Sequence, residues 1–304
     1  MGKKFWIPFF IVILIALGGF FFWHRKAVEE DRGHVDLTDL SSVYDAQEET
    51  DEAIEKFKKD PAAHKAKVIH PLTDTGKNVY LYFDGLPDRA MAEEILSVLD
   101  KKKAKAAFFA EGQNGADSPE TLKAIVKKGQ VIGNYTWLGR PEFQKLEPEK
   151  AIRSMVRTQK ALGLYMQKKP DFFRAPRTEY TDTLLEEAGA SGLSYVVLSN
   201  LTVRRGQLKS SSDAAELVKD IKPGSLIAFE INPPLDLKRQ EVGKWDERPA
   251  IDKKPTIRDD HFRTDVKKKD RTAEEVGWLI DALEEEGFDL ESLYGKALLS
   301  ALKD

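Results

Sequence analysis

The stretch NVYLYFDGLPD, residues 78–88, decides the fold and raises the question of function. Its β-forming residues, Val79 to Phe83, are followed by a single carboxylate, Asp84, and then by Gly-Leu-Pro. A short apolar run that ends in turn residues is typical of a buried strand. An acid at the carboxyl end of such a strand lies where α/β enzymes often place catalytic groups. Asp84 is therefore the first candidate for a functional residue.

Apolar runs of the same kind recur along the rest of the chain, separated by amphipathic stretches with the 3.6-residue period of helices. Repeated strand–helix alternation predicts parallel strands covered by helices, either as a barrel or as a doubly wound sheet. In both architectures, chemistry is expected in the loops at the carboxyl ends of the strands. The further strand candidates are residues 104–110, 130–134, 171–174, 194–199 and 225–231.

The composition excludes several classes of protein. A net charge of -3 over 304 residues gives no basis for nucleic-acid binding. The chain has no cysteine, which excludes disulfides and thiolate-ligated metal sites and fits a location outside the cytoplasm.

Residues 1–26 are predicted to form a membrane anchor. The segment from Phe5 to Trp23 carries no charge, and as a helix it would span about 28 Å, close to the thickness of a bilayer core. A cleavable signal peptide is the alternative, but no small-x-small cleavage motif follows the apolar segment. Lys3 and Lys4 favour an N-terminus inside the cell, whereas Arg25 and Lys26 favour the opposite. We expect a single-pass protein with its N-terminus inside and its main domain extracytoplasmic, in the periplasm or at the cell surface.

The rest of the chain divides into two parts. Residues 27–77 show no convincing buried pattern and are predicted to be a charged, solvated stalk. Residues 78–304 are predicted to form the main domain. Within it, residues 231–270 are polar and rich in Pro, and a loop of that length inside a compact domain is usually functional or disordered.

Five strand-end segments, taken in order, resemble the polysaccharide deacetylase family, carbohydrate esterases that remove acetyl groups from N-acetylated sugars. The resemblance covers residues 78–293 and implies a distorted (β/α) barrel with fewer than eight strands. The segments that carry it are YFDGLP (82–87), KAAFF (105–109), GQVIGNYTWLGRP (129–141), FRAPRT (173–178) and GSLIAFE (224–230).

The resemblance assigns the general base to Asp84 and the arginine that orients it to Arg174. It also places Gly85, Tyr135 and Gly139 where the family has its metal-binding aspartate and two histidines. Glycine has no donor atom, and neutral tyrosine is a poor ligand for a divalent metal. This family needs the metal to activate a water and polarise the carbonyl, so the resemblance implies a degenerate site without a cofactor.

Two further positions of the family pattern are Glu230, which stands in place of the general-acid histidine, and Arg177, whose backbone N–H could still contribute to an oxyanion site. With Tyr135 and Trp137, Arg177 forms the predicted substrate-binding set, in which the aromatic rings would face sugar rings. Two alternatives stay open. Asp84 and Arg174 could form a structural ion pair, and Trp137 could belong to the core.

The sequence therefore predicts a membrane-anchored deacetylase-like domain that binds a cell-wall or surface glycan, or acts as a scaffold, without catalysis. An active deacetylase is the alternative, with a divalent metal such as zinc held by an unconventional site. Another hypothesis assigns residues 231–270 to docking of a protein partner. The unconventional metal site would draw its ligands from Glu230, Asp259, Asp260, His261 and Asp265.

Overall fold

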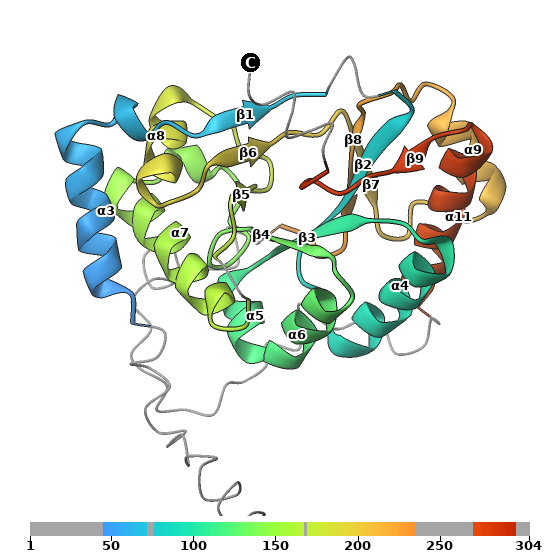
Figure 1. The fold of residues 1–304 in the computed structure, drawn as a ribbon, viewed down its shortest axis with the longest axis horizontal. Coiled ribbons are helices and arrows are strands. Elements are labelled where there is room, and N and C mark those ends of the chain that lie inside the picture. The colour runs from blue at the N-terminus through green and yellow to red at the C-terminus, as the bar shows by residue number, and fades with distance from the viewer. Residues whose placement is uncertain (1–44, 72–75, 167–168, 235–269, 296–304) are drawn as a thin grey trace, which may run out of the picture. The chain divides into compact units, whose positions relative to one another are not determined.

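The computed structural model describes residues 45–71, 76–166, 169–234 and 270–295. Within these ranges, parallel strands form one sheet in the order β1-β6-β5-β4-β3-β2-β8-β7, and β9 pairs with β2 at the start of that strand (Figure 1). The strands are β1 (Lys67–Ile69), β2 (Asn78–Asp84), β3 (Ala106–Ala110), β4 (Val131–Asn134), β5 (Phe172–Phe173), β6 (Tyr195–Val197), β7 (Leu201–Arg204), β8 (Leu226–Glu230) and β9 (Asp289–Leu290).

Helices connect and cover these strands. In space, α11 packs on α4 and α9, while α7 packs on α3, α5 and α8 (Figure 1). The α-helices are α3 (Gln47–Lys59), α4 (Arg89–Lys102), α5 (Gly112–Asp117), α6 (Pro119–Lys127), α7 (Pro148–Gly163), α8 (Asp182–Ala190), α9 (Ser211–Val218) and α11 (Thr272–Glu285), and short 3-10 turns are η2 (Ala62–His64) and η3 (Phe143–Lys145).

The sheet is curled. Strands β6 and β7 lie near opposite ends of the strand order in the sheet, yet the loop that connects them consists only of residues 198–200. Four Cα–Cα steps span at most about 15 Å, so the β6 and β7 regions of the sheet must approach each other. The predicted parallel (β/α) fold of barrel type is confirmed, and the doubly wound alternative is wrong. All six strand candidates correspond to observed strands, whereas the short strands β1, β7 and β9 were not predicted.

Both faces of β2 are buried, which explains its continuous apolar run. Val79, Leu81 and Phe83 pack with the helices on the outside of the curl. Tyr80 and Tyr82 pack on the other face with inward-facing residues of the neighbouring strands. Because side chains alternate along a strand, Asp84 lies on the same face as these two tyrosines. The period of the strand thus directs the carboxylate to the inside of the curl.

The prediction of a solvated stalk over residues 27–77 is wrong for the part that the structure describes. Helix α3 buries Ala53 and Ile54 against Ile152 and Val156 of α7. Strand β1 pairs in parallel with β6. A thin apolar stripe is enough for α3 because the helix buries only one face, against α7 and α8. The folded domain therefore begins before residue 78.

The predicted anchor, residues 1–26, and most of the insertion, residues 235–269, lie outside the described residues. Among the helices that the structure describes, none combines the length and apolar character that a membrane crossing requires.

Candidate functional site

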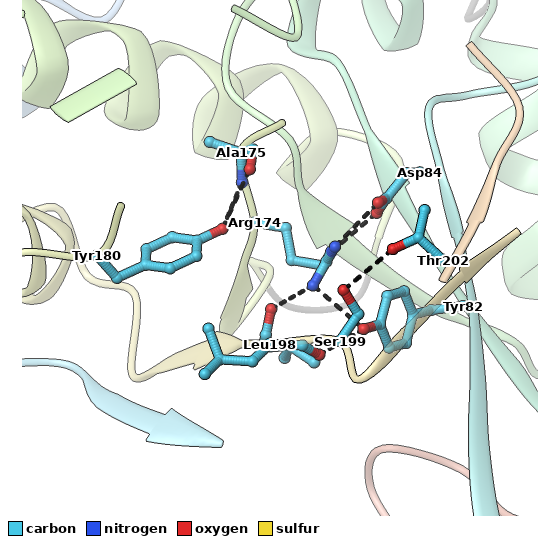
Figure 2. A network of polar contacts seen from close by, with 9 residues as sticks. Tyr82, Asp84, Arg174, Ala175, Tyr180, Leu198, Ser199 and Thr202 are labelled. Carbon is cyan, nitrogen blue, oxygen red and sulfur yellow. Dashed lines mark hydrogen bonds and ion pairs between the residues drawn. The ribbon is translucent and has the colours of Figure 1, made fainter. Parts of the chain in front are cut away.

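The carboxyl ends of the strands carry a buried ion pair between Asp84 and Arg174 (Figure 2). Arg174 donates from Nε to Asp84 Oδ1 at 2.8 Å and from Nη2 to Oδ2 at 2.9 Å. Asp84 is 4% exposed and Arg174 is 7% exposed. A bidentate ion pair of this geometry fixes the orientation of both side chains. The structure thus shows an ion pair between these two residues, and contact of either side chain with a glycan stays a prediction.

Further hydrogen bonds and a ring contact hold the Arg174 guanidinium. Nη1 of Arg174 donates to the carbonyl of Val197 at 2.5 Å and to the Tyr82 hydroxyl at 3.2 Å. The guanidinium also lies 4.5 Å from the centroid of the Tyr82 ring, a favourable cation–π geometry. Tyr82 in turn donates to the carbonyl of Leu198. These contacts hold Arg174 in one orientation and leave both Asp84 oxygens occupied.

The turn after β5 positions Arg177. The Tyr180 hydroxyl accepts from the Ala175 N–H at 2.8 Å and closes the turn (Figure 2). Arg177 has a φ of 46°, which is uncommon for a residue with a side chain. Its carbonyl accepts from the N–H of Glu142, which has a φ of 54°. The backbone is thus held in a specific shape, and the Arg177 side chain is exposed.

Glu230 lies beside Asp84, because the two residues are register partners on the parallel strands β2 and β8. Arg204 is the partner of Glu230 on the other side, on β7. Burial raises the pKa of the Glu230 carboxyl, and the nearby Arg177 and Arg204 oppose that rise. The structure therefore brings the predicted residues Asp84, Arg174, Arg177 and Glu230 to one edge of the sheet.

Gly85 stands where the resemblance places a metal-binding aspartate, and its surroundings leave no room for a side chain. A Cβ built on Gly85 would lie 2.6 Å from Cβ, 2.8 Å from Cγ and 2.7 Å from Nδ2 of Asn232. The φ of Gly85 is 101°, a conformation that glycine alone adopts without strain. Space and backbone both disfavour a carboxylate at this position.

Gly139 and Tyr135 stand where the resemblance places two histidines. A Cβ on Gly139 would face Glu111 at 3.4 Å and Tyr135 at 3.6 Å, so the two positions are neighbours as the motif predicts. Burial raises the pKa of Tyr135 well above its ordinary value, which keeps the phenol neutral. Thr136, with a φ of 63°, shapes this loop and accepts from the Gly139 N–H at 3.0 Å.

The aromatic residues predicted to face sugar rings are buried. Tyr135 is 2% exposed and Trp137 is 8% exposed. The Arg157 guanidinium lies over the Trp137 ring, 3.8 Å from the ring centroid. The backbone N–H of Trp137 donates to Ser154 Oγ at 3.0 Å. Trp137 therefore packs in the core. Contact of either ring with a sugar stays a prediction and would require these side chains to move.

Two site residues were not found from the sequence. Glu111 is 5% exposed and accepts from the Leu86 N–H at 2.7 Å and from the Asn232 amide at 3.1 Å. Burial raises the pKa of Glu111, and these hydrogen bonds oppose the rise. Glu111 directly follows β3, and Asn232 lies shortly after the end of β8. Glu111, like Asp84, is an acid at the carboxyl end of an apolar run, and this is the sequence signal that identifies it.

The residues present do not fit a metal of the kind that the resemblance implies. Gly85 and Gly139 supply no donor, Tyr135 is a buried neutral phenol, and Asn232 fills the space beside Gly85. In the part of the chain that the structure describes, no group of three or more His, Asp or Glu side chains is placed to hold a metal ion. The proposed ligands Asp259, Asp260, His261 and Asp265 lie outside that part.

Comparisons with known proteins agree with the motifs. Residues 72–196 match the polysaccharide deacetylase family model. A chitooligosaccharide deacetylase of Bradyrhizobium is 24% identical over 220 residues, which are 71% of this chain and 89% of that protein. A peptidoglycan-N-acetylglucosamine deacetylase of Bacillus cereus is 28% identical over 155 residues, which are 51% of this chain and 56% of that protein.

A solved structure shares the fold at a TM-score of 0.52 and 19% identity, and the match covers 72% of this chain and 64% of that one. It is described as a family 4 carbohydrate esterase pseudoenzyme from Bacillus anthracis. Residues 72–196 are therefore similar to the polysaccharide deacetylase family, and the chain shares its fold with a solved family 4 carbohydrate esterase homologue.

Proposed function

We propose that this protein is a non-catalytic polysaccharide deacetylase-like domain that binds or positions an N-acetylated cell-wall or surface glycan. The single observation that supports it best is the state of the Asp84 carboxylate. Both of its oxygens accept hydrogen bonds from Arg174, and the neighbouring position is a glycine whose side-chain volume is already filled.

Amide hydrolysis requires an activated water and stabilisation of the developing oxyanion. The two oxygens of Asp84 both accept hydrogen bonds from the Arg174 guanidinium, so the carboxylate is directed at the arginine and not at a water. Glu230 and Glu111 are the other acids at the strand ends. Glu230 is flanked by Arg177 and Arg204, and Glu111 is bonded to Leu86 and Asn232. The edge is therefore better suited to binding polar groups than to removing a proton from water.

The groups at the edge define how a glycan would be held. Arg177 and Arg204 are exposed and Glu230 is partly exposed. Guanidinium groups donate to hydroxyl, acetamido and carboxylate oxygens, and a carboxylate accepts from sugar hydroxyls. We propose that these three side chains contact the glycan and that Asp84 and Arg174 hold the edge in shape.

The proposal also includes location. The apolar segment from Phe5 to Trp23 would anchor the protein in a membrane with the N-terminus inside, and the domain would lie outside the cytoplasm. Names of related proteins, which refer to peptidoglycan and chitooligosaccharide, support an envelope glycan as the ligand. Docking of a protein partner through residues 231–270 stays a separate prediction.

Binding of the full-length chain to insoluble peptidoglycan and to chitooligosaccharide tests the proposal. Arg177→Ala and Arg204→Ala are expected to weaken binding at least tenfold. Arg153→Ala is the matched control, since this arginine lies on α7 and bonds to Gln47 of α3. Failure of the wild-type chain to bind either glycan would contradict the glycan-binding proposal and leave the scaffold version.

An acetate-release assay with the same glycans tests the absence of catalysis. It should be run with zinc, cobalt and nickel added in turn, and no acetate above background is expected. Release that a chelator abolishes would instead support the alternative of an active deacetylase with an unconventional site. In that case His261→Ala should also abolish it.

A further inference from the structure

A compact group of side chains and backbone atoms lies beside Gly85 at the ends of three strands. Asn232, after β8, projects into the space that any side chain at position 85 would need. Its Nδ2 donates to the Leu86 carbonyl at 2.9 Å and to Glu111 Oε1 at 3.1 Å. Its backbone N–H donates to the Asp84 carbonyl at 3.2 Å.

Glu111 closes the group from the side of β3. Its Oε2 accepts from the Leu86 N–H at 2.7 Å, so the N–H and the carbonyl of Leu86 are both bound by this pair of side chains. Leu86 is 1% exposed, Glu111 5% and Asn232 7%. A buried polar group is costly unless it is hydrogen-bonded, and here both Glu111 oxygens, Asn232 Nδ2 and both backbone groups of Leu86 have partners.

The group therefore joins segments that are distant in sequence. Leu86 follows β2, Glu111 follows β3 and Asn232 follows β8. A metal ion with ligands on several strand ends would tie such segments together in the same way, since binding free energy of a structural ion contributes to folding. A fully satisfied network of hydrogen bonds can do this without an ion.

We infer that the Leu86–Glu111–Asn232 network is a structural replacement for a metal centre, in which Asn232 occupies the volume of the missing ligand at position 85. Two consequences follow. New ligands at Gly85, Tyr135 and Gly139 do not recreate a metal site while Asn232 is present. A side chain at position 85 and the side chain of Asn232 exclude each other. The inference concerns the same edge as the proposed function but does not require that a glycan binds there.

A double-mutant cycle on the full-length chain tests the mutual exclusion. Gly85→Ala is made in the wild type and in Asn232→Gly, and the melting temperature is measured for all four proteins. The strain from the positive φ is present in both backgrounds and cancels. The loss of melting temperature caused by Gly85→Ala is expected to be at most half as large in the Asn232→Gly background. Equal losses in the two backgrounds would overturn the inference.

The cycle can also be interpreted if one of the single variants does not fold. If Gly85→Ala does not fold but Gly85→Ala/Asn232→Gly does, the inference is supported. If Asn232→Gly does not fold by itself, Asn232→Ala takes its place. It removes Cγ and Nδ2, which would lie 2.8 and 2.7 Å from the new Cβ, and keeps the Asn232 Cβ at 2.6 Å. A reduced loss is still expected in that background, and an undiminished loss overturns the inference.

Zinc titration by calorimetry tests the other consequence. The triple variant Gly85→Asp/Tyr135→His/Gly139→His is expected to bind no zinc, because Asn232 remains in place. Stoichiometric zinc binding by that variant would overturn the inference. Binding only after Asn232→Gly is added would support it, and if neither variant binds, the thermal cycle decides. None of these measurements depends on glycan binding, so failure here is distinct from failure of the proposed function.

Discussion

Removal of the Arg174 side chain is expected to destabilise the domain strongly. The Arg174→Met variant leaves the Asp84 carboxylate, 4% exposed, without its two hydrogen bonds of 2.8 and 2.9 Å. Breaking a buried ion pair by removing one partner costs about 3–5 kcal/mol. The Val197 carbonyl also loses its donor at 2.5 Å, which adds about 1–3 kcal/mol if no water replaces it. The unfolding free energy should therefore fall by about 4 kcal/mol or more.

The double variant Asp84→Leu/Arg174→Met separates the ion pair from the other contacts. Replacing a buried pair by apolar residues of similar volume is often neutral, so only the cost at the Val197 carbonyl should remain. We expect the double variant to be about 3–5 kcal/mol more stable than Arg174→Met alone, because the cost of the unpaired Asp84 carboxylate is removed.

Urea denaturation followed by circular dichroism gives the free energies, with unchanged m-values as the check on two-state behaviour. Arg153→Ala, which removes an arginine on the α3–α7 face, is the control and should change stability by less than about 1 kcal/mol. The reasoning is refuted if Arg174→Met costs under about 1 kcal/mol, or if the double variant is no more stable than Arg174→Met.

Three other predictions concern stability. Burial raises the pKa of Glu187 from 4.5 to about 8, so the stability that Glu187 contributes to the folded domain falls as the pH rises through that range. Glu187→Gln should therefore stabilise the domain by about 1–2 kcal/mol at pH 9 and not at pH 4. Urea denaturation at both pH values measures the difference. Ile54→Ala should lower the unfolding free energy by about 2–3 kcal/mol because Ile54 packs on α7, whereas the control Glu55→Ala should change it little. If both variants melt at the same temperature, α3 behaves as a solvated stalk. Lys103 ends α4 with a φ of 53°, so Lys103→Gly should raise the unfolding free energy by up to about 1 kcal/mol. The control Glu94→Gly, within the helix, should lower it by about 1 kcal/mol. A lower melting temperature for Lys103→Gly would contradict the role of Lys103 as a left-handed helix cap.

Local patterns were sufficient for the main strands and failed for the peripheral ones. Strands β2, β3 and β8 are buried on both faces, so their apolar runs are continuous and visible in the sequence. Strand β1 has the burial pattern exposed, intermediate, buried over only three residues. A segment that short carries no periodic signal, and its pairing with β6 depends on a partner that lies more than a hundred residues later. The boundary of the domain was therefore placed too late.

The candidate site was predicted in part for the same reason. Position 84 and the turn after β5 could be identified because motifs and strand ends are local features. The bond between Asp84 and Arg174 joins residues 90 positions apart, and the sequence left it as one of two alternatives. Burial of Trp137 beneath Arg157 likewise depends on how the loop after β4 packs on α7.

The amino-acid sequence by itself determined the parallel α/β class, the inward direction of Asp84 and the lack of donor atoms at Gly85 and Gly139, since these follow from side-chain period and side-chain chemistry. Only the tertiary structure decided what fills the space beside Gly85. Asn232 and Glu111 are 121 positions apart, and they meet because the order of strands brings the ends of β3 and β8 to either side of β2. Contacts of that kind arise from the arrangement of the sheet, and no local preference of the chain encodes them.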